Sequence, residues 1–577
     1  VTDLDYRGAD IGDNVDPAFI GNGTRLALND RRSGWVWNVP DGALVASSQQ
    51  WDLDRQIEVE QQDDATSERV VDPKPPVAVD DAFGVRAGSV TLLPVLLNDH
   101  DPNEDVLSID PASLENLDPA FGTASITGAQ QQLTVAVSPD AAGTATLRYR
   151  VTDGTAADGL LSDVATVTLT VVPDDQNTAP VWCGVEGCLA SWPSLTVAPG
   201  GTVSAELLEG WVDPEGDPVF LAGATNDTGV GTVTTSPEGT LTYQHPDPNA
   251  TEGLAVTITV TVSDARGATV TQPLTITVTP TPELTAESFA VTGVVGEPLD
   301  VSVAPYVTGA AGPVTLSGVV PLDEAQTTAA ANPAALSMVV TASAPGSFLV
   351  QYTVRDSLTE ATATVRVTML APESAGITTP PLTAFVRPNE DATIDVASAV
   401  SNPAGSVLLL SDIRPESDPF ASLGVDLVGQ SLLRVSGTTD SGEPGRLGVV
   451  RYTVSDGTGS AAATAQGELT VVLLPSATAE PPIAVDDAVT VRAGTQIDIP
   501  VLDNDTAPSG ALIAIDPSSI VNETGGGLAF ATSRLLRYLA PEQAGTYALT
   551  YTIFRLGFPE VRDTARVTVT VVGDESN

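Results

Sequence analysis

The residues best suited to chemistry are acidic and lie in two short loops. The first loop reads Asn98-Asp99-His100-Asp101-Pro102-Asn103-Glu104-Asp105, and the second reads Asp213-Pro214-Glu215-Gly216-Asp217. Each loop follows an apolar stretch and precedes another, so the two occupy equivalent places in their segments. Alternating carboxylates in a loop bent by Pro or Gly can direct several oxygens at one centre. Ca²⁺ favours such a centre, because it takes six to eight oxygen ligands.

Two residues outside the loops complete the candidate calcium ligands. Asp81 stands at the start of its segment and Asp153 follows a Tyr-containing strand, so both could reach the first loop if the loops meet at one end of a domain. The full candidate set is Asp81, Asp99, Asp101, Asn103, Asp105, Asp153, Asp213, Glu215 and Asp217. The alternative is a solvated turn, since Asp, Asn, Gly and Pro are ordinary turn formers. The corresponding stretch 308–312 keeps the turn residues without the carboxylates, which indicates that the turn does not require a metal to form.

The two cysteines, Cys183 and Cys188, enclose Gly184 and Gly187. This spacing suits a small loop closed by a disulfide in an oxidising compartment. A zinc site would need more ligands than the two histidines of the chain can help to supply. A redox pair would normally have two residues between the cysteines, so a structural disulfide is the favoured reading.

Three tryptophans, Trp182, Trp192 and Trp211, surround the cysteine pair. Exposed Trp rings are favoured at binding interfaces and can stack on sugar rings, so these residues are a candidate ligand patch. The alternative is that they fill the end of their domain or its junction with the preceding one.

Catalytic chemistry has little support. The histidines, His100 and His245, both lie in turns, and neither is accompanied by a nucleophile motif. Lys74 is the single lysine, which leaves most of the chain without the residue that phosphate-binding loops and Schiff-base enzymes require. No carboxylate pair stands out among the 74 acidic residues. We therefore expect no enzyme, no catalytic residues and no organic cofactor.

The composition predicts the elements that must position these residues. The chain has 577 residues, 50 Gly, 44 Pro and 42% hydrophobic residues, with many Val and Thr. Val and Thr favour strands, whereas Gly and Pro favour turns, so an all-β protein is predicted. The length exceeds what one hydrophobic core usually supports, which indicates several domains.

One pattern recurs along the chain at intervals of about a hundred residues. A turn with Pro and Gly leads to a strand of the type Tyr-x-Val-x-Asp, and a long Val/Thr strand closed by Pro or Gly follows. The Tyr position falls at Tyr149, Val260, Tyr352, Tyr452 and Tyr551. Every second residue of these strands is apolar, which predicts one buried and one solvated face for each sheet. The tyrosine is expected to place its ring in the core and its hydroxyl on a nearby loop.

The domain starts carry a second repeated sequence. Residues 75–81 read Pro-Pro-Val-Ala-Val-Asp-Asp and residues 481–487 read Pro-Pro-Ile-Ala-Val-Asp-Asp, each followed by Val-Arg-Ala-Gly at 85–88 or 491–494 and by Asn-Asp at 98–99 or 504–505. These residues resemble bacterial immunoglobulin-like, cadherin-like tandem repeat domains of large secreted or surface proteins. The resemblance implies β-sandwiches with an architectural or adhesive role, often with calcium. The acidic loops make the first and second domains the candidates for Ca²⁺.

The expected organisation is five tandem Ig-like sandwiches in an elongated rod, preceded by a partial β element. The boundaries are 1–72 for the partial element and 73–174, 175–280, 281–372, 373–475 and 476–577 for the five sandwiches. Residues 1–72 loosely resemble the closing blade of a β-propeller; a partial sandwich or a cap is the alternative. Pro-rich linkers such as residues 280–282 favour short, stiff connections.

The net charge of −50 bears on partners and location. Such a surface repels phosphate backbones and anionic lipids, so nucleic-acid binding and direct membrane contact are not expected. The chain shows no membrane-spanning run and no signal peptide, and it reads as a segment of a longer protein that is secreted or on the cell surface. The expected function is a non-enzymatic stalk. The alternatives are an adhesin that binds proteins, surface components or glycans through the Trp patch, and an accessory region of an enzyme or secretion-linked complex.

Overall fold

The structure is a computed structural model that describes residues 74–573, except 116, 128, 155–159, 251–252, 334, 372–375, 403–405, 461–462, 477–480, 508–510 and 533, together with three strands nearer the N-terminus. The chain forms two compact units, Val1–Pro73 and Lys74–Asn577. Among the described residues, no helix has the length and apolar character needed to cross a bilayer.

The described part of the first unit is a small antiparallel sheet. Its strands are β1 (Pro17–Gly21), β2 (Leu26–Asp30) and β3 (Val36–Asn38), with β2 between the other two. Phe19 lies opposite Leu28, and Leu28 lies opposite Trp37. These strands lie within the expected partial β element, and its resemblance to a propeller blade stays a prediction.

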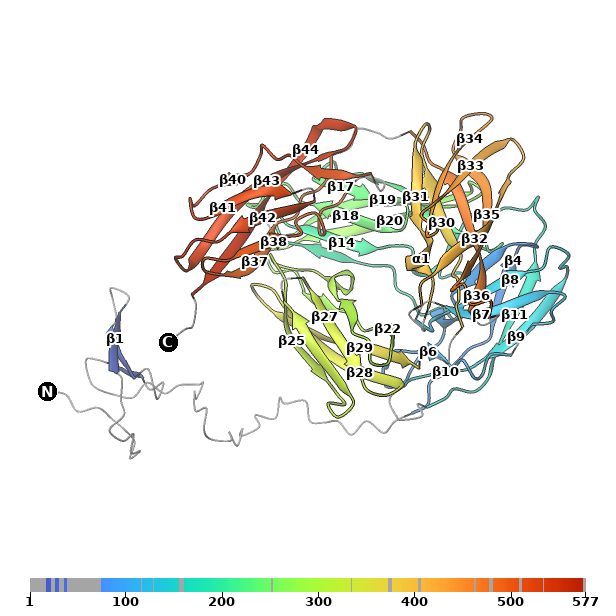
Figure 1. Cartoon of the computed structure of the whole chain (residues 1–577), viewed down its shortest axis with the longest axis horizontal. Helices are drawn as coiled ribbons and strands as arrows, with labels where there is room; N and C mark the ends of the chain where they lie inside the picture. Colours follow the sequence, from blue (N-terminus) through green and yellow to red (C-terminus); the bar gives the residue numbers. More distant parts are fainter. Residues whose placement is uncertain are drawn as a thin grey trace. The chain divides into compact units, whose positions relative to one another are not determined.

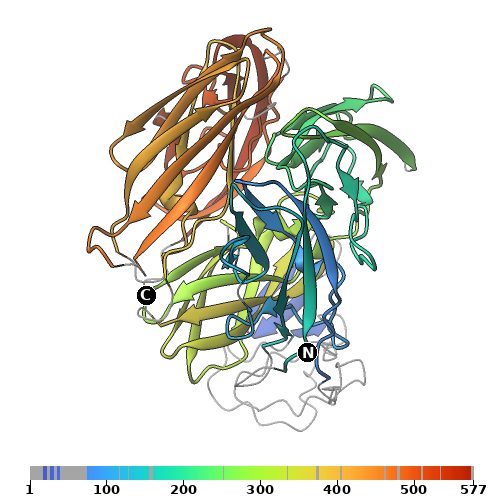
Figure 2. The ribbon, with the colours of Figure 1, turned by 90° about the vertical axis from the view of Figure 1, so that its right-hand side faces the viewer.

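The second unit contains five β-sandwiches in the described residues, and Figure 1 colours them from blue to red in the order of the sequence. Each sandwich has two facing sheets, and one of them is built by the same rule throughout. A strand near the start of each sandwich pairs in parallel with the last strand, and the last strand pairs antiparallel with the strand that carries the recurrent Tyr or Val260. Figure 2, turned by 90° from the view of Figure 1, shows the sheets of the sandwiches from another side. The fold class is therefore the predicted one, all-β with tandem Ig-like sandwiches; the rod-like arrangement stays a prediction.

The elements of the first two sandwiches follow in chain order. The first contains β4 (Asp81–Val85), β5 (Val90–Leu93), η1 (Val95–Leu97), β6 (Ser108–Ile109), β7 (Gly122–Thr127), β8 (Gln132–Val137), β9 (Thr144–Tyr149), β10 (Val151–Thr152) and β11 (Ala165–Val171), with sheets β4-β11-β9, β5-β8-β7 and β10-β6. The second contains β12 (Val181–Trp182), β13 (Leu195–Val197), β14 (Thr202–Glu206), β15 (Trp211–Val212), β16 (Val219–Asn226), β17 (Thr232–Thr235), β18 (Thr240–Gln244), β19 (Leu254–Asp264) and β20 (Thr269–Val278), with sheets β13-β20-β19-β16, β14-β18-β17 and β12-β15.

The remaining three sandwiches repeat this layout. The third contains β21 (Thr285–Ala286), β22 (Phe289–Val294), β23 (Leu299–Ser302), η2 (Ala304–Tyr306), β24 (Val307–Thr308), β25 (Thr315–Pro321), β26 (Thr327–Asn332), β27 (Ser337–Ala342), β28 (Gly346–Arg355) and β29 (Glu360–Leu370). The fourth contains β30 (Leu382–Val386), β31 (Asp391–Asp395), α1 (Val396–Ala399), β32 (Leu409–Ser417), β33 (Ala421–Val428), β34 (Leu432–Thr439), β35 (Gly445–Ser455) and β36 (Thr464–Leu473). The fifth contains β37 (Asp487–Arg492), β38 (Gln496–Ile499), β39 (Ile513–Ile515), β40 (Val521–Asn522), β41 (Leu528–Thr532), β42 (Leu535–Leu539), β43 (Gly545–Arg555) and β44 (Phe558–Val572).

The alternation in the sequence explains why each sandwich has a core of its own. In β28, Phe348, Val350, Tyr352 and Val354 are buried, while the residues between them are half-buried or exposed. Burial of one such apolar side chain contributes roughly 1.5–3 kcal/mol, so a strand with four of them is held firmly on one face. A shift by one residue would expose all four, which fixes the register.

The recurrent tyrosines lie in these cores as predicted. Tyr149, Tyr352 and Tyr551 are fully buried, and the Tyr352 hydroxyl donates to the carbonyl of Glu287 at 2.6 Å. The hydroxyl therefore fastens the loop that enters the domain. Tyr452 is the exception, because its buried hydroxyl has no hydrogen-bond partner among the described residues.

Candidate metal centre and the second acidic loop

The first acidic loop lies between η1 and β6 and is shaped by Asp101. One carboxylate oxygen of Asp101, Oδ1, accepts the backbone N–H groups of Asn103 at 2.6 Å and Asp105 at 3.4 Å. Its carbonyl accepts the N–H of Glu104, which has a left-handed φ of 66°. The Asn103 side chain is directed away and accepts the N–H of Lys74 at 2.9 Å. The loop is therefore a tight turn closed by its own aspartate, as the turn interpretation required.

Three of the predicted ligands nevertheless converge. Carboxylate oxygens of Asp101, Asp105 and Asp153 all lie within 4.8 Å of one another. Asp101 and Asp153 are buried, and the Oδ2 atom of Asp101 has no hydrogen-bond partner. Burial, followed by the charges of Asp101 and Asp153, raises the pKa of Asp105 to about 6. The charge of Arg366, in the third sandwich, opposes this rise of the Asp105 pKa. The buried Oδ2 atom of Asp101 is left without its solvation.

Two other predicted ligands belong to a separate cluster around Tyr149. The Tyr149 hydroxyl lies 3.1 Å from Asp81 Oδ2, 2.9 Å from Asp99 Oδ2 and 3.2 Å from the carbonyl of Val95. Burial is the main cause that raises the pKa of Asp81 to about 7 and that of Asp99 to about 6. The hydroxyl has one proton to donate to two carboxylates and a carbonyl, so the two carboxylates favour keeping a proton of their own. The cluster holds the start of the first sandwich in place.

The second acidic loop, between β15 and β16, has the same internal hydrogen bonds as the first. Asp213 Oδ1 accepts the N–H groups of Glu215 at 3.1 Å and Asp217 at 2.9 Å, and the Asp213 carbonyl accepts that of Gly216. Gly216 has a φ of 80°, where the first loop has Glu104. Asp213 and Asp217 thus correspond to Asp101 and Asp105, and Asp264 at the end of β19 corresponds to Asp153.

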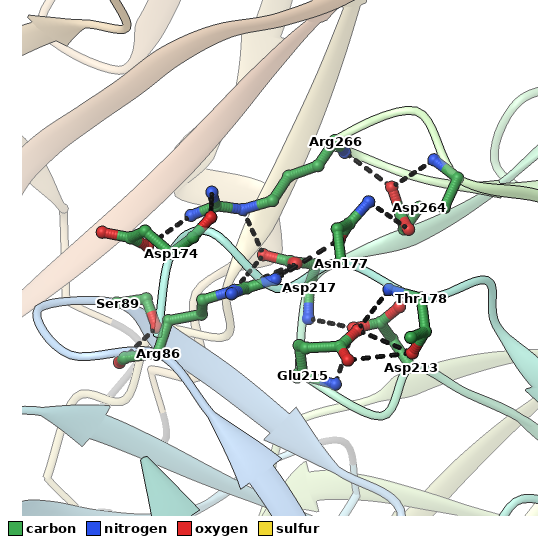
Figure 3. A network of polar contacts seen from close by, with 12 residues as sticks. Arg86, Ser89, Asp174, Asn177, Thr178, Asp213, Glu215, Asp217, Asp264 and Arg266 are labelled. Carbon is green, nitrogen blue, oxygen red and sulfur yellow. Dashed lines mark hydrogen bonds and ion pairs between the residues drawn. The ribbon is translucent and has the colours of Figure 1, made fainter. Parts of the chain in front are cut away.

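The side chain of Asp217 has different neighbours from that of Asp105. Arg86, which follows β4 in the first sandwich, donates from Nη2 to Asp217 Oδ2 at 2.6 Å and from Nε to the same oxygen at 3.1 Å (Figure 3). Arg266, two residues after Asp264, donates to Asp217 Oδ1 at 3.1 Å and to Asp174 Oδ1 at 2.9 Å. Two guanidinium groups therefore neutralise the carboxylate that would otherwise complete a second acidic cluster.

The linker between the two sandwiches is held by the same network, as Figure 3 shows. Arg86 donates to the carbonyl of Pro173 at 2.7 Å and to Asn177 Oδ1 at 3.3 Å. Asn177 in turn donates to Asp264 Oδ2 at 3.1 Å. Glu215 accepts both the N–H and the hydroxyl of Thr178, at 3.0 and 2.8 Å. Glu215, a predicted metal ligand, is thus directed to the linker.

Asp213 remains without a full set of partners. Its Oδ2 atom is buried and unpaired, and burial together with the charges of Asp217 and Asp264 raises its pKa to about 7. The desolvated carboxylate is therefore readily protonated near neutral pH.

The cysteine pair forms the predicted disulfide, with Cα atoms 5.5 Å apart. The loop it closes covers the end of the first sandwich. The N–H of Leu189 donates to the carbonyl of Leu97 at 2.8 Å, and the Asn98 side chain donates to the carbonyl of Glu186 at 3.1 Å. Val185 is buried in the core of the first sandwich. The disulfide loop thus serves the junction.

The three tryptophans pack on one another in T-shaped pairs. The Trp182–Trp192, Trp182–Trp211 and Trp192–Trp211 ring centroids are 4.9, 5.7 and 6.0 Å apart. Trp211 is buried, and Trp182 and Trp192 are half-buried against the core of the second sandwich. This packing matches the alternative of a filled domain end; the ligand patch stays a prediction.

The residues that sequence reasoning missed are those that form ion pairs or hydrogen bonds with the second acidic loop or with its partners. They are Arg86, Asp174, Asn177, Thr178, Asp264 and Arg266. A signal was present for Arg86, which belongs to the repeated Val-Arg-Ala-Gly sequence, and for Asp264, which ends the strand equivalent to that before Asp153.

The sequence profile described as "Bacterial Ig domain" matches residues 73–170, 177–277 and 479–571, together just over half of the chain. The chain therefore belongs to the bacterial Ig domain family. The matches coincide with the first, second and fifth sandwiches, and the third and fourth share their strand pairing. No curated protein sequence matches the chain.

Several solved structures resemble the chain at low identity. The human desmocollin-1 ectodomain is 13% identical, with 87% of this chain and 99% of that chain covered and a TM-score of 0.16. The N-terminal four Ig domains of Dscam1 isoform 6.9 are 12% identical, with coverages of 70% and 100% and a TM-score of 0.22. An endo-fucoidan hydrolase of glycoside hydrolase family 107 is 14% identical with a TM-score of 0.16, covering 52% of this chain, which spans 45% of the hydrolase chain. TM-scores this low carry no argument about function.

Proposed function

We propose that this chain is a non-enzymatic spacer segment of a secreted or surface-exposed bacterial protein, with a Ca²⁺ site in its first sandwich. The observation that carries the spacer is the repetition of one sandwich plan from β4 to β44, with the first two copies joined by buried contacts. Polar groups at the joint are hydrogen-bonded to the linker and the neighbouring loop, which suits a fixed connection between the two sandwiches.

The histidines support a structural role. His100 pairs through its backbone with Val77 at the entrance to the first sandwich. His245 is buried, and its ring nitrogen Nδ1 accepts the N–H of Gly200 at 3.2 Å. Both residues therefore serve turns, and neither is placed beside a nucleophile in the contacts of the described residues.

The calcium site is supported by the fit between the cluster and a hard cation. Asp101, Asp105 and Asp153 offer carboxylate oxygens, the ligands that Ca²⁺ prefers, and Asp101 Oδ2 is a buried acceptor without a donor. A bound Ca²⁺ would neutralise the cluster and tie the loop after η1 to the loop after β10. Extracellular modules of this kind bind Ca²⁺ with a Kd on the order of 10⁻⁴–10⁻³ M.

Thermal unfolding in EDTA and in about 5 mM Ca²⁺, well above that Kd range, tests the site. We expect Ca²⁺ to stabilise the first sandwich by about 1–2 kcal/mol, from the mass-action relation. Asp101→Asn should abolish this gain. Asp140→Asn is the matched control, because Asp140 is an exposed acidic residue of the same sandwich and is not in the cluster. Equal melting with and without Ca²⁺ would reject the site.

Small-angle scattering of the same chain tests the spacer. Sandwiches arranged end to end should give a maximum dimension of roughly 200 Å, from ordinary strand lengths. A compact globular profile would contradict the spacer and leave the calcium result unaffected.

A further inference from the structure

The two acidic loops have the same backbone but different charge partners. In the first, Asp105 faces Asp101 and Asp153. In the second, the equivalent Asp217 is paired with Arg86 and Arg266. The second loop therefore has two positively charged guanidinium groups at the carboxylate that, in the first loop, faces two other carboxylates.

Arg86 is built into this position. It is 2% exposed, and all of its side-chain nitrogens have acceptors: Asp217, the carbonyl of Pro173 and Asn177. A buried guanidinium is stable only when its charge and its donors are matched, and its planar fork suits a carboxylate. Because Pro173 and Asn177 belong to the linker and Asp217 to the second sandwich, one side chain joins three parts of the junction.

The backbones at the junction approach each other so closely that two glycines are required. A Cβ atom on Gly84 would lie 2.0 Å from the carbonyl oxygen of Pro214, and one on Gly216 would lie 2.6 Å from that of Gly84. Any side chain at either position would separate β4 from the second acidic loop. Leu189, the residue directly after the disulfide loop, adds a hydrogen bond to Leu97 at the same junction.

The fifth sandwich shows that the Val-Arg-Ala-Gly sequence alone does not produce this arrangement. Arg492 occupies the position of Arg86, but it is exposed and has no side-chain partner among the described residues. Thr490 stands where the first sandwich has Gly84, since both lie one residue before the final Val of the strand paired in parallel with the last strand. The junction therefore depends on the combination of Gly84, Arg86 and the second acidic loop.

We propose that the Arg86–Asp217–Arg266 pairing takes the place of a divalent cation in the second acidic loop, so that the joint between the first and second sandwiches is fixed without metal. The proposal refines the proposed function, because it confines Ca²⁺ to the first loop. It also assigns Asp213, Glu215 and Asp217 to the joint in place of the metal site that their spacing suggested.

Hydrogen exchange of the full chain, followed by mass spectrometry in EDTA and in Ca²⁺, tests the proposal. The reporters are the N–H groups of Leu189 and Thr178, which are bonded across or onto the junction. We expect both to be protected equally in the two buffers. Arg86→Ala and Asp217→Asn should accelerate their exchange by at least about tenfold, because the joint then opens locally.

Gly84→Thr is the sharper variant, since it introduces the residue that the fifth sandwich carries at the same strand position. Exchange in β8 reports whether the first sandwich remains folded. Arg492→Ala is the matched control and should change neither reporter. Protection of Leu189 and Thr178 that requires Ca²⁺ in the wild type, or that survives Arg86→Ala, would overturn the proposal. The exchange of residues 99–105 in the same samples reports the first loop separately, so a failure of the calcium site is distinguishable from a failure of the joint.

Discussion

Arg86 and Asp217 are 131 residues apart in sequence, yet they form a buried ion pair with 2.6 Å between Nη2 and Oδ2. The pair links the strand that opens the first sandwich to the acidic loop of the second. Its side chains are 2% and 5% exposed, so neither charge could be solvated if its partner were lost.

Loss of one partner should therefore be costly. We expect Asp217→Asn or Arg86→Ala to lower the free energy of unfolding of the first two sandwiches by about 3–5 kcal/mol, because a buried charge is left unpaired. Denaturant unfolding of the full chain, followed by exchange in β8 and β18, measures the loss. The double variant Arg86→Met/Asp217→Leu removes both charges and should recover part of it. A loss below about 1 kcal/mol, typical of an exposed pair, would show that the charges are solvated.

Removal of both arginines should convert the second loop into a cation site. In Arg86→Ala/Arg266→Ala, the carboxylate of Asp217 would lose both of its guanidinium partners, leaving Asp213, Asp217 and Asp264 close together. We expect calorimetric titration with Ca²⁺ to show one additional site with a Kd on the order of 10⁻⁴–10⁻³ M. The same double variant carrying Asp213→Asn is the control and should lose that site. An unchanged stoichiometry would mean that the arginines are not what excludes the cation.

The fifth sandwich should lose stability as the pH rises. The Tyr551 hydroxyl lies 3.1 Å from Asp487 Oδ2 and 3.2 Å from Asp505, and burial is the main cause that raises the pKa of Asp505 to about 8 and that of Asp487 to about 7. Both values exceed 3.8, the ordinary Asp pKa, so the folded state binds the protons more tightly than the unfolded chain does. The stabilisation is complete below pH ~4 and is lost as the pH rises through about 7–8.

The slope due to Asp505 should reach about 1.4 kcal/mol per pH unit between these limits. Unfolding of the fifth sandwich between pH 5 and pH 9 measures it, and Asp505→Asn should flatten the profile. The nearby acidic residues Asp486, Asp503 and Asp563 remain in this variant. Asp498→Asn is the matched control, because hydrogen bonding to Arg537 lowers the pKa of Asp498 and removes its titration from this range. If the free energy of unfolding of the wild-type sandwich did not change between pH 5 and pH 9, the buried carboxyl groups would not retain their protons as proposed.

Reduction of the disulfide should loosen the junction more than either sandwich core. Cys183 and Cys188 close a short loop, for which the chain-entropy model gives about 2 kcal/mol. Leu189 directly follows Cys188 and donates to the carbonyl of Leu97, so Cys183→Ser/Cys188→Ser should accelerate exchange at Leu189. Exchange at Leu274 in β20, in the core of the second sandwich, is the internal control. Equal acceleration at both positions would indicate that the disulfide stabilises the whole domain.

The sequence alone determined the fold class, because it depends on local patterns. Alternation in strands such as β28 sets one buried face, and the recurrence of the Tyr strand sets the repeat. The spacing of Cys183 and Cys188 likewise determined the disulfide, since a loop this short leaves few alternatives. The acidic loops were found as candidates for the same reason: their residues are neighbours in the chain.

Only the tertiary structure decided what each carboxylate contacts. Asp105 and Asp217 occupy the same place in the same turn, and no local pattern distinguishes them. Asp105 meets Asp101 and Asp153, whereas Asp217 meets Arg86 across the junction. Packing between residues far apart in the sequence determines the partner of each carboxylate. For Asp217 this packing requires Gly84 and Gly216, because any side chain there would keep the two backbones apart. Because the free energy of a buried charge depends on its surroundings more than on its own sequence, the same motif can form a cluster of carboxylates in one sandwich and an arginine joint in the next.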